Sequence, residues 1–213
     1  MDASVYERSN SSYCSHWFCI VKKDMTSLHL IRSLEPLNTV TIQHSGITPF
    51  TEQIAEQFTG CTCGGILNLY VGYNEHALTL SLRDYMTFQT PYGTLHLTKL
   101  PMGWMNIVPI FHNNVTHNLQ PKVPKYTIPY IDNIPIHGLV STCQNDDRVF
   151  ETIPESNSIC CFIWEHFQNV NQIVQHMKYS GGTFSSKKSL VCTCEITVVG
   201  FVCTPEGHIL DPV

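Results

Sequence analysis

Short runs in which apolar and polar residues alternate recur along the chain, and a period of two is typical of half-buried β-strands. The runs at residues 15–22 and 27–33 flank a polar turn, which predicts a β-hairpin. The runs at residues 85–89 and 94–100 flank a Pro-Tyr-Gly turn and predict a second hairpin. Both hairpins fit an antiparallel sheet, in which one face is buried and the other meets water.

Two other stretches are also β-like. Residues 66–71 (ILNLYV) read as a buried strand that only Asn68 interrupts. Residues 189–202 are rich in β-branched residues and precede a turn at residues 205–207 (PEG). The second stretch therefore predicts a further hairpin near the end of the chain.

Three segments show the spacing of an amphipathic helix instead. They are residues 51–58, residues 106–119 and residues 159–179. Thr51 is expected to cap the first helix, because its hydroxyl can accept a hydrogen bond from the first turn. The third helix carries one apolar stripe, made by Phe162, Phe167, Val170, Val174 and Met177.

The order of these elements mixes hairpins with helices instead of alternating single strands with helices. Such an order is typical of an α+β fold. The sequence therefore predicts an antiparallel sheet that is backed by helices on one face.

The segment around residues 127–137 is a candidate hairpin with an acidic tip. Its two β-branched runs meet at Asp132 and Asn133, a pair that tolerates the positive φ of a tight turn. Pro129 and Pro135 disfavour a central strand, because each lacks the backbone N–H that a sheet ladder requires. Taken alone, the Asp-Asn pair predicts an ordinary turn.

Composition narrows the class of protein. The chain has 213 residues, 43% of them hydrophobic, which is enough for one large domain or two small subdomains. Its net charge is −5, so the chain as a whole does not attract nucleic acid, and nucleic-acid binding would need a local basic groove. No apolar run is long enough to cross a bilayer and the first ten residues are polar, so we expect no membrane association and an intracellular protein of the cytoplasm or nucleus.

The ten cysteines include two Cys-Thr-Cys pairs, at Cys61 and Cys63 and at Cys192 and Cys194. Neither pair has the C-x-x-C spacing of a structural zinc site. Reduced thiols are therefore expected. A metal-binding module that uses the two pairs remains as an alternative.

Three stretches in order resemble motifs A, B and C of the reverse transcriptases of gypsy-type LTR retrotransposons. They are ILNLYVGY at residues 66–73, LPMGWMNIVPIFH at 100–112 and YIDN at 130–133. VKKD at residues 21–24 and FQTPYGTLHLTKLPMGW at 88–104 extend the resemblance, which covers the chain from about residue 15 to its end.

The resemblance implies one reverse-transcriptase-like domain with fingers and palm, which would be part of a Pol polyprotein. Residues 1–60 and 80–104 correspond to the fingers, and residues 61–79 and 105–213 to the palm. The thumb, RNase H and integrase of the family are expected to be absent.

The implied activity is RNA-directed DNA polymerisation, in which two Mg²⁺ ions stabilise the attacking and the leaving oxygens. The family holds these ions with one Asp in motif A and an Asp-Asp pair in motif C. Here the corresponding residues are Asn68 and the Asp132-Asn133 pair, so Asp132 is the one remaining carboxylate ligand. An amide oxygen brings no charge to a hard cation, and the resemblance therefore implies a catalytically impaired nucleotidyltransferase.

The resemblance also implies contacts with an RNA template, a DNA primer and deoxynucleoside triphosphates. Tyr73 corresponds to the aromatic gate under the deoxyribose, and Met102 and Gly103 to the motif B turn beside the incoming nucleotide. Lys23 and Lys188 correspond to basic positions that face the triphosphate.

The departures from the family share a direction, because Asn68 and Asn133 replace Asp and His29 replaces Arg. G:C to A:T transitions would produce such changes, which suggests a degenerate copy of the element. Two readings stay open beside an impaired polymerase: a non-catalytic nucleic-acid-binding module and a vestigial retrotransposon fragment.

Overall fold

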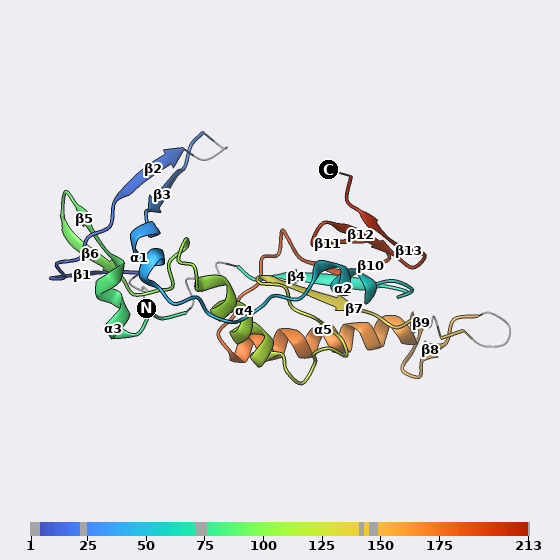
Figure 1. Cartoon of the computed structure of the whole chain (residues 1–213). Helices are drawn as coiled ribbons and strands as arrows, with labels where there is room; N and C mark the ends of the chain where they lie inside the picture. Colours follow the sequence, from blue (N-terminus) through green and yellow to red (C-terminus); the bar gives the residue numbers. More distant parts are fainter. Residues whose placement is uncertain (1–4, 22–24, 71–75, 141–142, 145–148, 213) are drawn as a thin grey trace. The chain divides into compact units, whose positions relative to one another are not determined.

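The structure is a computed structural model, and it describes residues 5–21, 25–70, 76–140, 143–144 and 149–212 (Figure 1). The chain divides into two compact units, each assembled from separate segments of sequence. Unit 1 consists of residues 1–45 and 71–111, and unit 2 of residues 46–70 and 112–213. Within the described residues, no helix is long and apolar enough to cross a membrane.

The strands of unit 1 form a three-stranded sheet and a separate hairpin. β5 (Thr87–Thr90) pairs with β6 (Gly93–Leu97), and β6 pairs in turn with β1 (Tyr6–Arg8), all antiparallel. β2 (Trp17–Val21) and β3 (Leu28–Arg32) make the separate hairpin. Both predicted hairpins are confirmed. β1 was not expected, because three exposed residues carry no alternation that a sequence pattern could reveal.

Short helices complete unit 1. They are α1 (Glu35–Val40), α3 (Leu80–Arg83) and the 3₁₀ helix η2 (Asp84–Met86). None was expected, since segments of three to six residues are too short to show a helical period. The core that they close contains Leu34, Leu37, Leu78, Met86, Leu97, Leu100, Trp104 and Ile107.

The central sheet of unit 2 has the order β10-β4-β7 and is antiparallel. Its strands are β4 (Gly64–Asn68), β7 (Asn133–His137) and β10 (Leu190–Thr193). Every residue of β4 is buried, but the strand covers residues 64–68 instead of the predicted 66–71, and Tyr70 of the predicted run is 59% exposed. The pairing of β4 with β7 places Asn68 opposite Asn133 at one end and Gly64 opposite His137 at the other.

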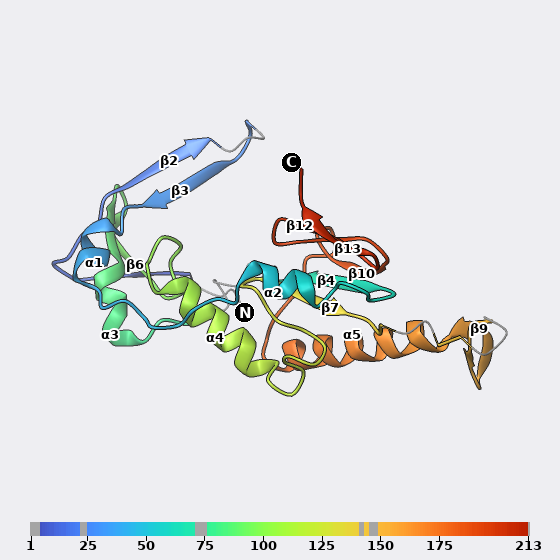
Figure 2. The same ribbon diagram turned by 45° about the vertical axis from the view of Figure 1, so that its right-hand side comes forward.

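α5 (Cys161–Tyr179) runs along one face of this sheet in both views (Figures 1 and 2). The other face carries α2 (Thr51–Glu56) and a second antiparallel sheet of β11 (Ile196–Val198), β12 (Phe201–Thr204) and β13 (Gly207–Leu210). The core on that face contains Ile54, Ala55, Phe58, Ile66, Ile196, Val198 and Cys203.

The fold is mixed, with helices and antiparallel sheets, as predicted. The prediction that helices back one face only is wrong for the central sheet of unit 2, because α5 and α2 lie on opposite faces. The remaining elements are α4 (Ile107–Asn118), which was predicted, and a hairpin of β8 (Thr152–Ile153) and β9 (Ser156–Cys160).

Two details of the predicted helices are also wrong. Thr51 is the first residue of α2 and not its cap, since Phe50 occupies the N-cap position without a side-chain hydrogen bond. The buried face of α5 consists of Phe162, His166, Asn169, Val170, Ile173 and Met177. Phe167, which the sequence predicts on the apolar stripe, is 42% exposed. The true face contains a histidine and an asparagine, which a search for apolar residues alone passes over.

Candidate functional site

The end of β4 and the start of β7 bring three polar side chains together. Asn68 and Asn133 are register partners across the two strands, and Asp132 immediately precedes β7. The Asn68 Nδ2 group donates to Asn133 Oδ1 at 2.8 Å and to Asp132 Oδ2 at 3.3 Å. The three residues that the motif order singled out therefore make one hydrogen-bonded group.

Three hydrogen bonds hold the backbone around this group. The Leu69 N–H donates to the Asp132 carbonyl at 2.8 Å. The Asn68 N–H donates to Ser189 Oγ at 3.1 Å, and the Asn68 carbonyl accepts from the Ser185 N–H at 2.8 Å. Asn68 is 9% exposed, so these bonds satisfy groups that water scarcely reaches.

The turn that presents Asp132 lies one residue earlier than predicted. Tyr130 and Asn133 exchange both backbone hydrogen bonds, at 2.8 and 2.9 Å, which puts Ile131 and Asp132 at the two central positions. The positive φ falls on Ile131, at 57°, and not on the Asp-Asn pair. A β-branched residue is rare in this conformation, so the turn stores backbone strain beside the candidate site.

The donor set of this group does not fit two Mg²⁺ ions. Mg²⁺ binds anionic oxygens, and Asp132 supplies the single carboxylate among the three side chains. The Asn68 amide nitrogen points at the oxygens of Asp132 and Asn133, where a cation would have to compete with its N–H groups. The opposite orientation of the amide would set its oxygen against two other oxygens. In this group a neutral amide therefore donates a hydrogen bond to the one carboxylate.

Lys188 lies in the turn that precedes β10. Its N–H donates to the Ser185 carbonyl at 3.2 Å, and its side chain is exposed. Ser185 and Ser189, which flank it, both bond to the backbone of Asn68. Sequence reasoning missed these two serines, because hydroxyl residues are common in loops and no motif marks them.

Met102 and Gly103 belong to unit 1, where they form an exposed turn. Gly103 has a φ of 93°, and its carbonyl accepts from Asn38 Nδ2 at 2.9 Å. The Asn38 Oδ1 atom in turn accepts from the Met105 N–H at 3.0 Å. One asparagine of α1 thus holds both ends of the turn. Lys23 and Tyr73, the other two predicted nucleotide contacts, lie outside the described residues, as does the side chain of His29.

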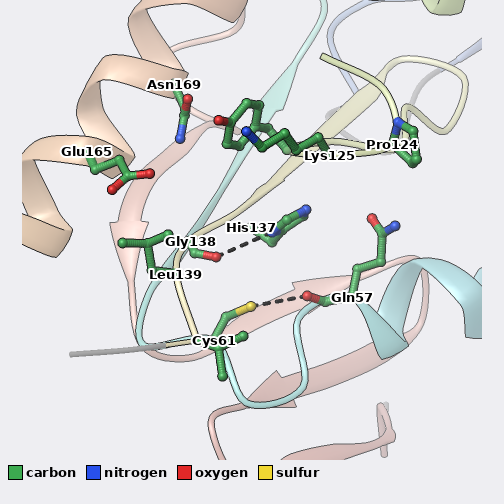
Figure 3. A pocket seen from close by; sticks show the side chains of 11 residues that line it. Gln57, Cys61, Pro124, Lys125, His137, Gly138, Leu139, Glu165 and Asn169 are labelled. Atoms are coloured by element: carbon green, nitrogen blue, oxygen red, sulfur yellow. Dashed lines mark hydrogen bonds between the residues drawn. The ribbon is translucent and has the colours of Figure 1, made fainter. Parts of the chain in front are cut away.

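Unit 2 also contains a cavity of about 610 Å³ between α5, β7 and the end of α2. Glu165 and Asn169 of α5 line one side of it, and Lys125 and His137 lie across from them (Figure 3). The Cys61 thiol donates to the Gln57 carbonyl at 3.1 Å on its floor. None of the residues predicted from the motifs lines this cavity.

Next to this cavity, the buried Cys63 thiol and His166 imidazole lie close to the exposed Cys192 thiol. Burial raises the pKa of Cys63 to about 12, and the neighbouring Cys192 thiol adds to the effect. Burial also lowers the pKa of His166 below its usual value. Sequence reasoning named Cys63 and Cys192 but missed His166. The available signal was a histidine at helical spacing within an apolar stripe.

No protein-family model matches the chain, and no curated protein matches it in sequence. Solved structures do match its fold. A foamy viral protease-reverse transcriptase dRH in complex with double-stranded DNA aligns with a TM-score of 0.77 at 19% identity, covering 97% of this chain. A foamy viral protease-reverse transcriptase in complex with an RNA/DNA hybrid aligns with a TM-score of 0.76, also at 19% identity and over 97% of this chain.

The native prototype foamy virus protease-reverse transcriptase aligns with a TM-score of 0.70 at 20% identity and over 97% of this chain. The alignments cover 32%, 24% and 24% of the three viral chains, so this chain spans a third or less of their length. At this level of identity the comparison establishes the fold. The chain has a fold like that of retroviral reverse transcriptase.

Proposed function

We propose that this chain is a reverse-transcriptase domain by descent, from the Pol polyprotein of a gypsy-type LTR retrotransposon, and that the copy is degenerate. The observation that carries the proposal is the meeting of Asn68, Asp132 and Asn133 at the adjoining ends of β4 and β7. These are the positions at which the family's motifs A and C carry carboxylates. The shared fold supports the same alignment.

The proposed state of the site is catalytically impaired. Two of the three expected carboxylates are amides, so the charge of the group falls from −3 to −1. The loss of a charged metal ligand removes several kcal/mol of transition-state stabilisation, because the metal neutralises charge that develops on the phosphoryl oxygens. The Asn68 amide also competes directly for the remaining carboxylate.

The other assignments of the proposal follow the same resemblance. Residues 1–60 and 80–104 are the fingers, and residues 61–79 and 105–213 are the palm. The substrates are an RNA template, a DNA primer and deoxynucleoside triphosphates. Nucleotide contacts are assigned to Tyr73, to the Met102-Gly103 turn, and to Lys23 and Lys188.

A second candidate function is binding of nucleic acid without catalysis. The specific observation in its favour is that matching viral proteins were solved with double-stranded DNA and with an RNA/DNA hybrid. A groove can survive when the metal ligands are lost, since phosphate contacts and metal ligation use different side chains.

Primer extension on an RNA template tests the proposal. The purified chain is compared with the Asn68→Asp, Asn133→Asp double variant, in Mg²⁺ and in Mn²⁺. We expect the unaltered chain to extend primer at least about 100-fold more slowly than the double variant, because each restored carboxylate returns a charged ligand. Extension by the unaltered chain at the rate of the variant would overturn the impairment.

Two controls sharpen the comparison. Asn113→Asp with Asn171→Asp makes the same charge change at two exposed positions and should leave extension unchanged. Adding Asp132→Asn to the double variant should abolish its gain, since that residue supplies the remaining carboxylate. If the double variant folds, as judged by circular dichroism, but does not extend primer, the polymerase ancestry of the site is not supported.

A further inference from the structure

Three potential metal ligands from separate segments converge on the α5 face of the central sheet in unit 2. They are Cys63, His166 and Cys192, and one ligand atom of each lies within 4.8 Å of the others. Cys63 directly precedes β4, Cys192 belongs to the neighbouring β10, and His166 comes from α5. Local sequence does not explain why ligands from three segments meet, because Cys63 and Cys192 are 129 positions apart.

The His166 ring makes the hydrogen bond that is typical of a histidine that binds a metal through its other nitrogen. It is 1% exposed, and its Nε2 atom lies 2.7 Å from the Val191 carbonyl, to which it donates its proton. The lone pair is therefore on Nδ1, which is buried and has no hydrogen-bond partner among the described residues. A metal ligand commonly fixes its other ring nitrogen on a backbone carbonyl in this way, and the buried lone pair on Nδ1 is left available to a ligand.

Cys63 is also fixed. Its carbonyl accepts from the Gly138 N–H at 2.9 Å, and its thiol is buried, with the residue 6% exposed. Cys192 is exposed, so the group opens to solvent on the side of β10. A ligand that enters from that side meets two sulfurs and one imidazole.

This donor set selects the metal. Thiolate and imidazole are soft and borderline ligands, which Zn²⁺ prefers and Mg²⁺ does not. Around tetrahedral zinc, two sulfurs stand about 3.8 Å apart, so the observed separations need only small side-chain rotations to close. The group is also remote from the amide site, since Asn68 lies five positions after Cys63, or about 17 Å along a strand.

We propose that Cys63, His166 and Cys192 form a zinc site with three protein ligands, whose fourth position is open to solvent beside Cys192. The ion fastens α5 to β10 and to the start of β4. This site is independent of the polymerase ancestry, because none of its ligands belongs to the nucleotide or Asp-Asn positions.

The test uses the full chain, reduced and stripped of metal by a chelator. Titration with Zn²⁺ alone should saturate at one equivalent per chain and raise the melting temperature. Titration with Co²⁺ alone should produce the visible absorption of tetrahedral cobalt together with a sulfur-to-cobalt charge-transfer band. Co²⁺ bound with a purely octahedral spectrum, or no saturable binding, would overturn the proposal.

Variants separate this site from adventitious binding. Cys192→Ser changes an exposed ligand and should keep the circular-dichroism spectrum while lowering Zn²⁺ affinity at least about 100-fold. Cys14→Ser, an exposed thiol in unit 1, should leave the affinity unchanged. Equal Zn²⁺ retention by Cys192→Ser would mean that the metal is adventitious.

Two further outcomes would also contradict the assignment. Cys194→Ser should retain zinc, so a loss of binding in that variant would show that the fourth position is not open. A Cys63–Cys192 disulfide in the chain isolated without reductant, with no zinc uptake after reduction, would replace the metal site by a redox pair.

Discussion

At the scale of single residues, the candidate site is decided by which atoms the side chains present. Asp and Asn have nearly the same shape, so Asn68 and Asn133 occupy their places in the sheet without disturbing it. Their chemistry differs, because an amide nitrogen donates where a carboxylate accepts. Asn68 therefore binds Asp132 directly, at 3.3 Å, instead of sharing a cation with it.

The same site carries backbone strain at Ile131, whose φ is 57°. Ile131→Gly should be more stable than Ile131→Ala by about 1 kcal/mol, because glycine adopts positive φ without a steric cost. This order is the reverse of the usual preference for alanine. Urea denaturation followed by circular dichroism measures the free energy of unfolding of both variants.

Ile128 is the matched control for this comparison. It is partly buried like Ile131 but does not have a positive φ. At Ile128, alanine should be the more stable substitution. If glycine and alanine rank in the same order at both positions, the strain assigned to the turn is absent.

At the scale of elements, β4 and β10 approach each other more closely than ordinary side chains permit. A Cβ atom on Gly65 would lie 2.5 Å from the Val191 carbonyl oxygen and 2.9 Å from that of Leu190. The pairing of the two strands is irregular at this point. Glycine is therefore required here by close approach of the backbone and not by a turn.

Gly65→Ala should lower the free energy of unfolding by about 1–3 kcal/mol, because backbone atoms cannot yield as a flexible side chain can. The displacement should fall on β10, whose Val191 carbonyl also accepts the His166 proton. Hydrogen exchange resolved by residue measures it, and the amides of β10 should exchange faster in the variant than in the unaltered chain.

Gly103→Ala provides the comparison. Its Cβ would meet open space, but its φ is 93°, so its cost is one of backbone conformation within unit 1. It should leave exchange in β10 unchanged. Faster exchange in β10 for both variants, or for neither, would contradict the close approach assigned to Gly65.

At the scale of the whole molecule, the two units each combine distant segments and carry a core of their own. The chain matches 97% of its own length to a viral protease-reverse transcriptase but only 32% of that protein's length. The given sequence therefore spans about a third of the length of that protein. The net charge of −5 repels the phosphate backbone of nucleic acid.

These features predict weak nucleic-acid binding. With 12 Lys and Arg against 17 Asp and Glu, we expect the chain to bind an RNA/DNA hybrid with a Kd no tighter than about 1 µM at physiological salt, the range of non-specific binding. Fluorescence anisotropy with a labelled hybrid, repeated from about 50 to 200 mM salt, measures both the affinity and its salt dependence.

The slope against salt is the internal control, since contacts to phosphate weaken steeply as counterions are added. A single-stranded DNA of the same length should show a shallower slope. Nanomolar binding that persists at high salt would contradict the prediction and would favour a dedicated nucleic-acid-binding module.

The sequence by itself determined most of the long elements and the order of the motifs. Period-two runs indicated the hairpins of β2 with β3 and of β5 with β6, and a β-branched run before a turn indicated the hairpin of β12 with β13. Helical spacing indicated α4 and α5. These patterns can be recognised in the sequence because the buried face of a strand takes every second residue and that of a helix every third or fourth.

Only the tertiary structure decided which side chains meet. The structure places Ile131 and Asp132 at the centre of the turn. It also shows that the Asn68 amide donates a hydrogen bond to Asp132. It also brought His166 to Cys63 and Cys192. Contacts between residues far apart in sequence depend on strand register and on which helix face is buried, and neither is encoded within a short stretch of chain.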